Sequence, residues 1–176
     1  MRFSRSGPHE LRPYALALLT GVLCALAFPP FGYTPLGWLA FVPLVVAVRR
    51  AGSWKQALLC GALAAVAMCA IGYGWIANTA HRFWSVPWPV AALLLLAFST
   101  FGEINFTIFA TLLWLLRSRL EKWPAAATAA LFVVTESFVV KVFPDALGHT
   151  QVDTPALPAA AALVGLPGLS FVVAWF

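Results

Sequence analysis

Apolar residues gather in six runs along the chain, separated by short stretches that hold most of the charged and turn-forming residues. The runs cover residues 14–28, 36–48, 57–77, 90–116, 125–142 and 156–176. A membrane-spanning helix needs about 20 mostly apolar residues, with a range of about 17–25. The pattern therefore predicts an all-α protein, a polytopic membrane helix bundle of about six apolar segments within a single transmembrane domain over residues 1–176.

The first two runs are short, and the stretch between them contains strong helix breakers. Residues 28–35 read "FPPFGYTP", and these prolines and the glycine exclude one continuous helix. Two alternatives remain open for residues 14–48: two short spans, or one re-entrant hairpin.

Composition supports a membrane protein. The chain has 176 residues, of which 62% are hydrophobic and 10% charged, whereas a soluble domain is about 45–50% apolar and about 25% charged. The net charge of +5 does not indicate nucleic acid as a partner, because the basic residues lie between the apolar runs and form no patch.

The distribution of basic residues predicts the orientation, since cytoplasmic connections are enriched in lysine and arginine. Only Arg82 and Lys141 lie in the connections assigned to the outer face. The other nine precede the first run, follow the second or follow the fourth: Arg2, Arg5, Arg12, Arg49, Arg50, Lys55, Arg117, Arg119 and Lys122. We therefore expect a cytoplasmic N-terminus. A signal peptide ending near "ALA" (25–27) is an alternative, although Pro29, Pro30 and a second apolar run follow at once.

Two polar residues interrupt the fourth run. Glu103 falls near the middle of the membrane, where an acidic side chain costs roughly 2.5–3.5 kcal/mol on insertion scales, and Asn105 follows two residues later. We expect Glu103 to be protonated or hydrogen-bonded within the bundle. Its role is either to join helices or to carry a proton or substrate.

The stretch 134–151, "VTESFVVKVFPDALGHTQ", places polar residues at the outer end of the fifth run. Glu136 lies inside the run, and Lys141 is expected to extend to the lipid headgroups. The candidates for a lipid or substrate site at the outer interface are Glu136, Pro144, Gly148, His149 and Gln151. The alternative is an ordinary solvated loop.

No complete catalytic constellation is visible, so no residue is assigned to catalysis. A cysteine nucleophile needs a base within hydrogen-bonding reach, but Cys24, Cys60 and Cys69 all lie within apolar runs. The cysteine spacing fits neither a metal site nor a disulfide, and glycine-rich phosphate loops are absent from the sequence. We expect no cofactor and no metal.

Several segments together resemble the apolipoprotein N-acyltransferase family. They are "CALAFPPFGYTPLGWLAFVPLV", "GYGWIANTAHRF", "VTESFVVKVFPDALGHTQVDTPAL" and "LVGLPGLSFVVAWF", and they occur in the family's order over nearly the whole chain. Each motif is weak alone, whereas their order and spacing are fairly specific. Glu136, Pro144, Gly148 and Gln151 match family motif positions. The chain departs from the family pattern at Asp145 and His149, where the family has tryptophan and tyrosine.

The resemblance implies an acyltransferase of the bacterial inner membrane that matures lipoproteins. Such an enzyme moves an acyl chain from a phospholipid to the N-terminal amine of a lipidated apolipoprotein, using a nitrilase-like domain that follows the helices. No segment here matches that domain, so we expect it downstream, with this chain a fragment that anchors the enzyme, forms the lipid-side access and is inactive alone. Two alternatives are a small transporter or channel subunit using Glu103, and a scaffold for a separate nitrilase-like protein.

Overall fold

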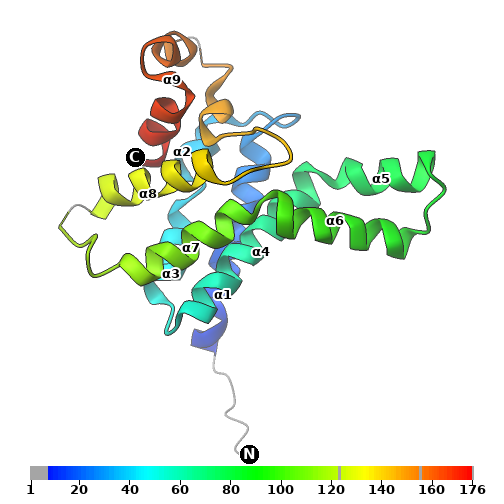
Figure 1. Ribbon diagram of the computed structural model, residues 1–176, viewed down its shortest axis with the longest axis horizontal. Coiled ribbons are helices and arrows are strands. Elements are labelled where there is room, and N and C mark those ends of the chain that lie inside the picture. Colours follow the sequence, from blue (N-terminus) through cyan, green and yellow to red (C-terminus); the bar gives the residue numbers. More distant parts are fainter. Residues whose placement is uncertain (1–7, 123, 155, 176) are drawn as a thin grey trace, which may run out of the picture.

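The computed structural model describes residues 8–122, 124–154 and 156–175. Within these ranges the chain forms nine α-helices and one 3-10 helix, with no strand, so the predicted all-α bundle is confirmed (Figure 1). The helices are α1 (Pro8–Ala27), α2 (Thr34–Leu39), α3 (Val42–Arg50), α4 (Trp54–Gly72), α5 (Gly74–Phe83), α6 (Trp88–Gly102), α7 (Ile104–Leu116), α8 (Pro124–Phe138), η1 (Leu147–Gln151) and α9 (Ala156–Trp175).

Local sequence signals explain where several helices begin. The Ser53 hydroxyl accepts a hydrogen bond from the Gln56 backbone N–H and caps α4. Proline occupies the first turn of α2, α3 and α6, where its missing N–H costs nothing because that group has no partner within the helix.

Four of the predicted apolar runs are broken helices, and one of them is the 57–77 run, which is divided between α4 and α5 at Tyr73. The 36–48 run is divided between α2 and α3, and the 90–116 run is divided between α6 and α7 by a bend of 46° at Glu103. The last run contains a kink at Gly165, whose φ of 71° is a conformation that favours glycine. The apolar pattern therefore located the helical segments but not the breaks within them.

By length and apolar composition, α4 can cross a membrane. The bent pair α6 and α7 also passes if the two helices are taken as one span. Three further apolar helices among the described residues are shorter, namely Leu11–Ala27, Pro124–Phe138 and Ala159–Trp175. Among the described residues, one helix, or two spans if the bent pair counts as one, thus passes this test of length and composition.

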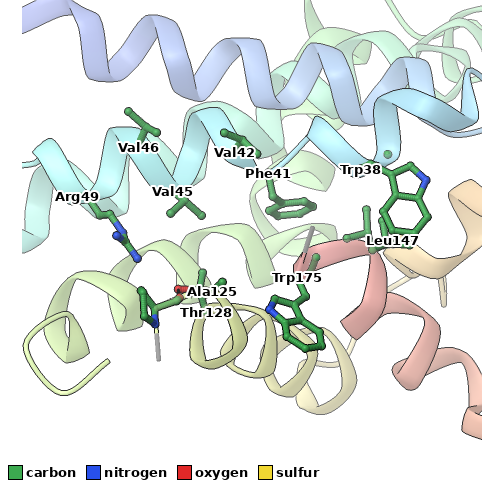
Figure 2. A pocket seen from close by; sticks show the side chains of 14 residues that line it. Trp38, Phe41, Val42, Val45, Val46, Arg49, Ala125, Thr128, Leu147 and Trp175 are labelled. Atoms are coloured by element: carbon green, nitrogen blue, oxygen red, sulfur yellow. Dashed lines mark hydrogen bonds between the residues drawn. The ribbon is translucent and has the colours of Figure 1, made fainter. Parts of the chain in front are cut away.

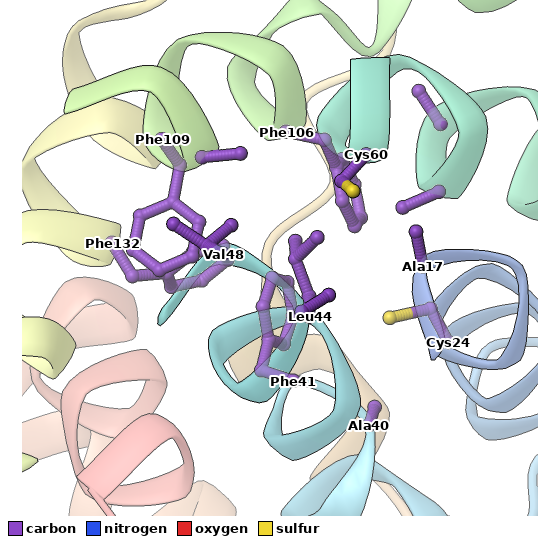
Figure 3. Close-up of a cluster of buried hydrophobic side chains, with 14 of the residues drawn as sticks. Ala17, Cys24, Ala40, Phe41, Leu44, Val48, Cys60, Phe106, Phe109 and Phe132 are labelled. Atoms are coloured by element: carbon purple, nitrogen blue, oxygen red, sulfur yellow. The ribbon is translucent and has the colours of Figure 1, made fainter. Parts of the chain in front are cut away.

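The main core lies where α1, α3, α4, α7 and α8 meet (Figure 3). Phe41 is at its centre, with ring centroids 5.4 Å from Phe106, 6.1 Å from Phe109 and 4.1 Å from Phe132. Cys24 and Cys60 lie in the same core, and all three cysteines are free and buried. The cysteines therefore pack as small apolar side chains, as their positions in the sequence suggested.

Small residues let α4 approach its neighbours closely. A β-carbon at Gly61 would lie 2.6 Å from the Phe106 carbonyl oxygen and 2.7 Å from the Thr107 α-carbon, both on α7. Close approach of this kind is common in membrane bundles, where packing replaces the hydrophobic effect between helices.

Candidate functional site

The loop between α8 and η1, residues 139–146, forms the wall of a pocket at the end of α8. This pocket has a volume of about 320 Å³ and is called the loop pocket below. It is lined by Glu136, Ser137, Val139, Lys141, Pro144, Asp145, Ala146, Leu166 and Pro167. Its lining combines charged side chains from α8 and the loop with apolar residues beside the kink of α9, as a site for an amphiphilic ligand requires.

Glu136 holds three elements together at the floor of the loop pocket. Its Oε1 accepts a hydrogen bond of 2.6 Å from the backbone N–H of Leu147, at the start of η1. Its carboxylate is also within hydrogen-bonding reach of Ser170 on α9. The Ser170 hydroxyl accepts from the Gly148 N–H at 2.9 Å, so one chain of hydrogen bonds joins α8, η1 and α9.

Lys141 points inward, contrary to the expectation that it extends to the headgroups. Its ammonium donates to the backbone oxygen of Asp145 at 2.5 Å and to the Asp145 carboxylate at 3.3 Å, and its side chain is 7% exposed. Asp145 lies four residues later in the loop and supplies both acceptors, so the lysine is satisfied inside the protein.

Glu103 and Glu136 both line one internal hollow of about 10 Å³, together with Asn105, Lys141 and Asp145. A hollow of this size is at the lower limit for holding one water molecule. With its amide nitrogen facing the carboxylate, Asn105 donates to Glu103 Oε2 at 3.1 Å. Asn105 is thus placed to hydrogen-bond Glu103 within the bundle, and the role of Glu103 stays a prediction.

Gly148 is required for packing rather than for a turn. A β-carbon there would lie 2.9 Å from Leu166 Cδ1 and 3.2 Å from the Ser170 backbone nitrogen. His149 is half-buried, and its Nδ1 accepts a hydrogen bond of 3.0 Å from the Ala146 N–H. Pro144 is exposed at the rim of the loop pocket.

Gln151 faces the interior and not the loop pocket. Its Oε1 accepts from Trp38 Nε1 at 3.0 Å, and its Nε2 donates to the Thr34 carbonyl at 3.0 Å and to the Thr150 hydroxyl at 2.9 Å. The side chain therefore ties η1 to α2. It contacts no part of the loop pocket, whereas Glu136 and Pro144 line it. The roles of all five candidates toward a lipid stay predictions.

Gln151→Leu is expected to lower the free energy of unfolding by about 1–3 kcal/mol, because buried polar partners lose their hydrogen bonds. Thermal unfolding in a fixed detergent measures the loss. Gln56→Leu is the control, because this glutamine accepts one exposed hydrogen bond from the Gly52 N–H. Equal effects of the two substitutions would contradict the structural role of Gln151.

Sequence reasoning missed two residues of this region. Tyr73, at the end of α4, donates from its hydroxyl to Asp145 Oδ2 at 2.9 Å. Ser170 is joined to both Glu136 and Gly148. Ser170 could have been singled out from the sequence, because it is the sole residue with a hydroxyl side chain in the 156–176 run.

A second hollow of about 280 Å³ is a lateral groove bordered by α3, α8 and the end of α9 (Figure 2). Phe41, Val45, Ala125 and Trp175 are among its lining residues, and Arg49 lies at one end. This groove contains no carboxylate and is mainly apolar, so the polar chemistry described above is confined to the loop pocket and the hollow beneath it.

Comparison with known proteins identifies the family. The family model described as the apolipoprotein N-acyltransferase N-terminal domain matches residues 20–176. A Geobacter metallireducens apolipoprotein N-acyltransferase is 34% identical over 93% of this chain and 32% of its own length. The Bdellovibrio bacteriovorus protein of the same name is 32% identical over 96% of this chain and 31% of its own length.

The Azotobacter vinelandii relative, also named apolipoprotein N-acyltransferase, is 34% identical over 90% of this chain and 32% of its own length. The chain thus spans about a third of the length of these relatives. The matched region includes the loop pocket, the hollow beneath it and every helix from α2 onward. The chain therefore belongs to the apolipoprotein N-acyltransferase family and carries the N-terminal domain of that family.

Proposed function

We propose that this chain forms the membrane domain of an enzyme that transfers an acyl chain from a phospholipid to the N-terminal amine of a lipidated apolipoprotein. The observation that carries the proposal is the family match over residues 20–176. The transfer itself takes place in a nitrilase-like domain supplied in cis or in trans. The helices anchor that domain in the bacterial inner membrane, with the N-terminus in the cytoplasm.

The loop pocket is the proposed lipid-side access. Its volume of about 320 Å³ lies within the range of small-molecule sites, about 300–1,000 Å³, and accommodates part of a phospholipid near its headgroup. Lys141 lines the pocket and is held by the Asp145 carboxylate, while Leu166 and Pro167 offer an apolar wall to the glycerol and acyl region.

A chimera tests this function. Residues 1–176 replace the corresponding N-terminal third of the Geobacter metallireducens relative, and mass spectrometry of a lipoprotein N-terminus measures acylation in cells that depend on the chimera. We expect acylation to be retained, because the 34% identity extends over 93% of this chain.

The same relative without any N-terminal domain is the control and is expected to give no acylation. Purified residues 1–176 alone are also expected to transfer no acyl group. The proposal is rejected if the chimera reaches the membrane in normal amounts and the lipoprotein amine stays free.

A further inference from the structure

Helices α5 and α6 form a hairpin, called the arm, that projects sideways from the bundle (Figure 1). The arm has its own small buried cluster of Ala77, Ala80 and Ala91, separate from the main core. It joins the bundle at two bends, one at Tyr73 between α4 and α5 and one at Glu103 between α6 and α7. Contacts at these bends therefore decide the direction of the arm.

A single carboxylate of the 139–146 loop reaches both bends. The Tyr73 hydroxyl donates to Asp145 Oδ2 at 2.9 Å, and the carboxyl group of Glu103 is within hydrogen-bonding reach of that of Asp145. Asp145 thus bonds to Tyr73 at the base of α5 and lines the same small hollow as Glu103 at the base of α6.

An aromatic side chain of the same loop contacts both helices of the arm. The Phe143 ring stacks on Tyr73 with centroids 5.6 Å apart and an interplanar angle of 4°. It also lies 5.7 Å from Phe98 on α6 and 6.1 Å from Trp75 on α5. Ring contacts at these distances are stabilising and restrict orientation, because aromatic pairs prefer offset or tilted geometries.

Lys141 fixes the shape of the loop that presents these two side chains. It donates to both the backbone oxygen and the carboxylate of Asp145, and its side chain is only 7% exposed. The charged groups that face Asp145 are Lys141 from the loop, Glu103 from the α6–α7 bend and Glu136 from α8. These contacts hold the loop in the conformation that presents Phe143 and Asp145 to the arm.

We propose that Phe143 and Asp145 form a clasp that sets the position of the α5–α6 arm relative to the bundle. Asp145 acts as a positioning residue through Tyr73 and Glu103, and Phe143 fills the inside of the elbow between the two arm helices. The proposal goes beyond the acyltransferase function and does not depend on it, because the arm position is measured without substrate.

Distance measurement between spin labels tests the clasp in the whole chain, reconstituted in lipid nanodiscs. The labels replace Asn78 on the arm and Ala130 on α8, both exposed, in a background with the three buried cysteines changed to alanine. Tyr73→Phe removes the hydroxyl bond, and Phe143→Ala removes the ring. Each is expected to raise the population of a displaced arm by about fivefold, the effect of one lost hydrogen bond or a comparable contact.

Matched controls are Tyr33→Phe and Phe138→Ala, since these side chains are 59% and 83% exposed. Both are expected to leave the distance distribution unchanged, with all four variants retaining their thermal unfolding temperature to within a few degrees. An unchanged distribution in both Tyr73→Phe and Phe143→Ala overturns the clasp, as does an equal change in the controls. Asp145→Ala is not used as a primary test, because it removes the anion that pairs with the buried Lys141 and so changes the loop itself.

Discussion

Glu136→Ala is expected to loosen the junction of α8, η1 and α9 and to reduce acyl transfer by the chimera to background. The carboxylate accepts the 2.6 Å hydrogen bond from the Leu147 N–H and reaches Ser170. Leaving a buried donor without its acceptor costs about 1–3 kcal/mol. The substitution also removes a carboxylate from the lining of the loop pocket. Thermal unfolding and lipoprotein acylation measure the two effects separately.

Glu136→Gln is the conservative comparison, because its amide oxygen can still accept from the Leu147 N–H. We expect this variant to recover most of the lost stability. Glu121→Ala changes an exposed carboxylate and should have little effect on either measurement. Wild-type stability and wild-type transfer in Glu136→Ala would show that the carboxylate neither supports the junction nor serves the pocket.

Gly61→Ala is expected to destabilise the bundle by about 1–3 kcal/mol, the usual cost of forcing extra atoms into a packed core. The new methyl group would lie 2.6 Å from the Phe106 carbonyl oxygen and 2.7 Å from the Thr107 α-carbon. These are backbone atoms of α7, so the two helices must separate. The midpoint of thermal unfolding in detergent reports the loss.

The matched control for this prediction is Gly74→Ala. A β-carbon at Gly74 meets nothing within 4 Å, and the residue is likewise helical, at the start of α5. Because alanine is the better helix former, this variant should be neutral or slightly stabilising. A Gly61→Ala protein as stable as the Gly74→Ala protein would mean that α4 and α7 do not pack as closely as described.

Hydropathy predicted the helical segments because it measures apolar composition over a long window, and that average does not register a bend. The 90–116 run therefore read as one segment, although Gly102 and Glu103 divide it into α6 and α7. In the 36–48 run the break between α2 and α3 falls at Ala40 and Phe41, two apolar residues, and its sequence signal is the proline in the first turn of α3.

The candidate site was predictable as a stretch of chain but not as a set of contacts. Glu136 and Pro144 were found because they interrupt or end an apolar run, and both line the loop pocket. Tyr73 could not be connected to this site, since it lies 72 residues from Asp145 in the chain. The prediction for Lys141 was wrong because membrane position alone did not account for an acceptor four residues away.

The separate buried cluster of the arm has a consequence for how the molecule opens. Its buried side chains are three alanines, Ala77, Ala80 and Ala91, supported by Val86 and Leu95, whereas the bundle core contains four packed phenylalanines. Regions with little buried apolar surface unfold locally at lower free energy than the molecule as a whole. We therefore expect the arm to open locally at a lower free energy than the bundle.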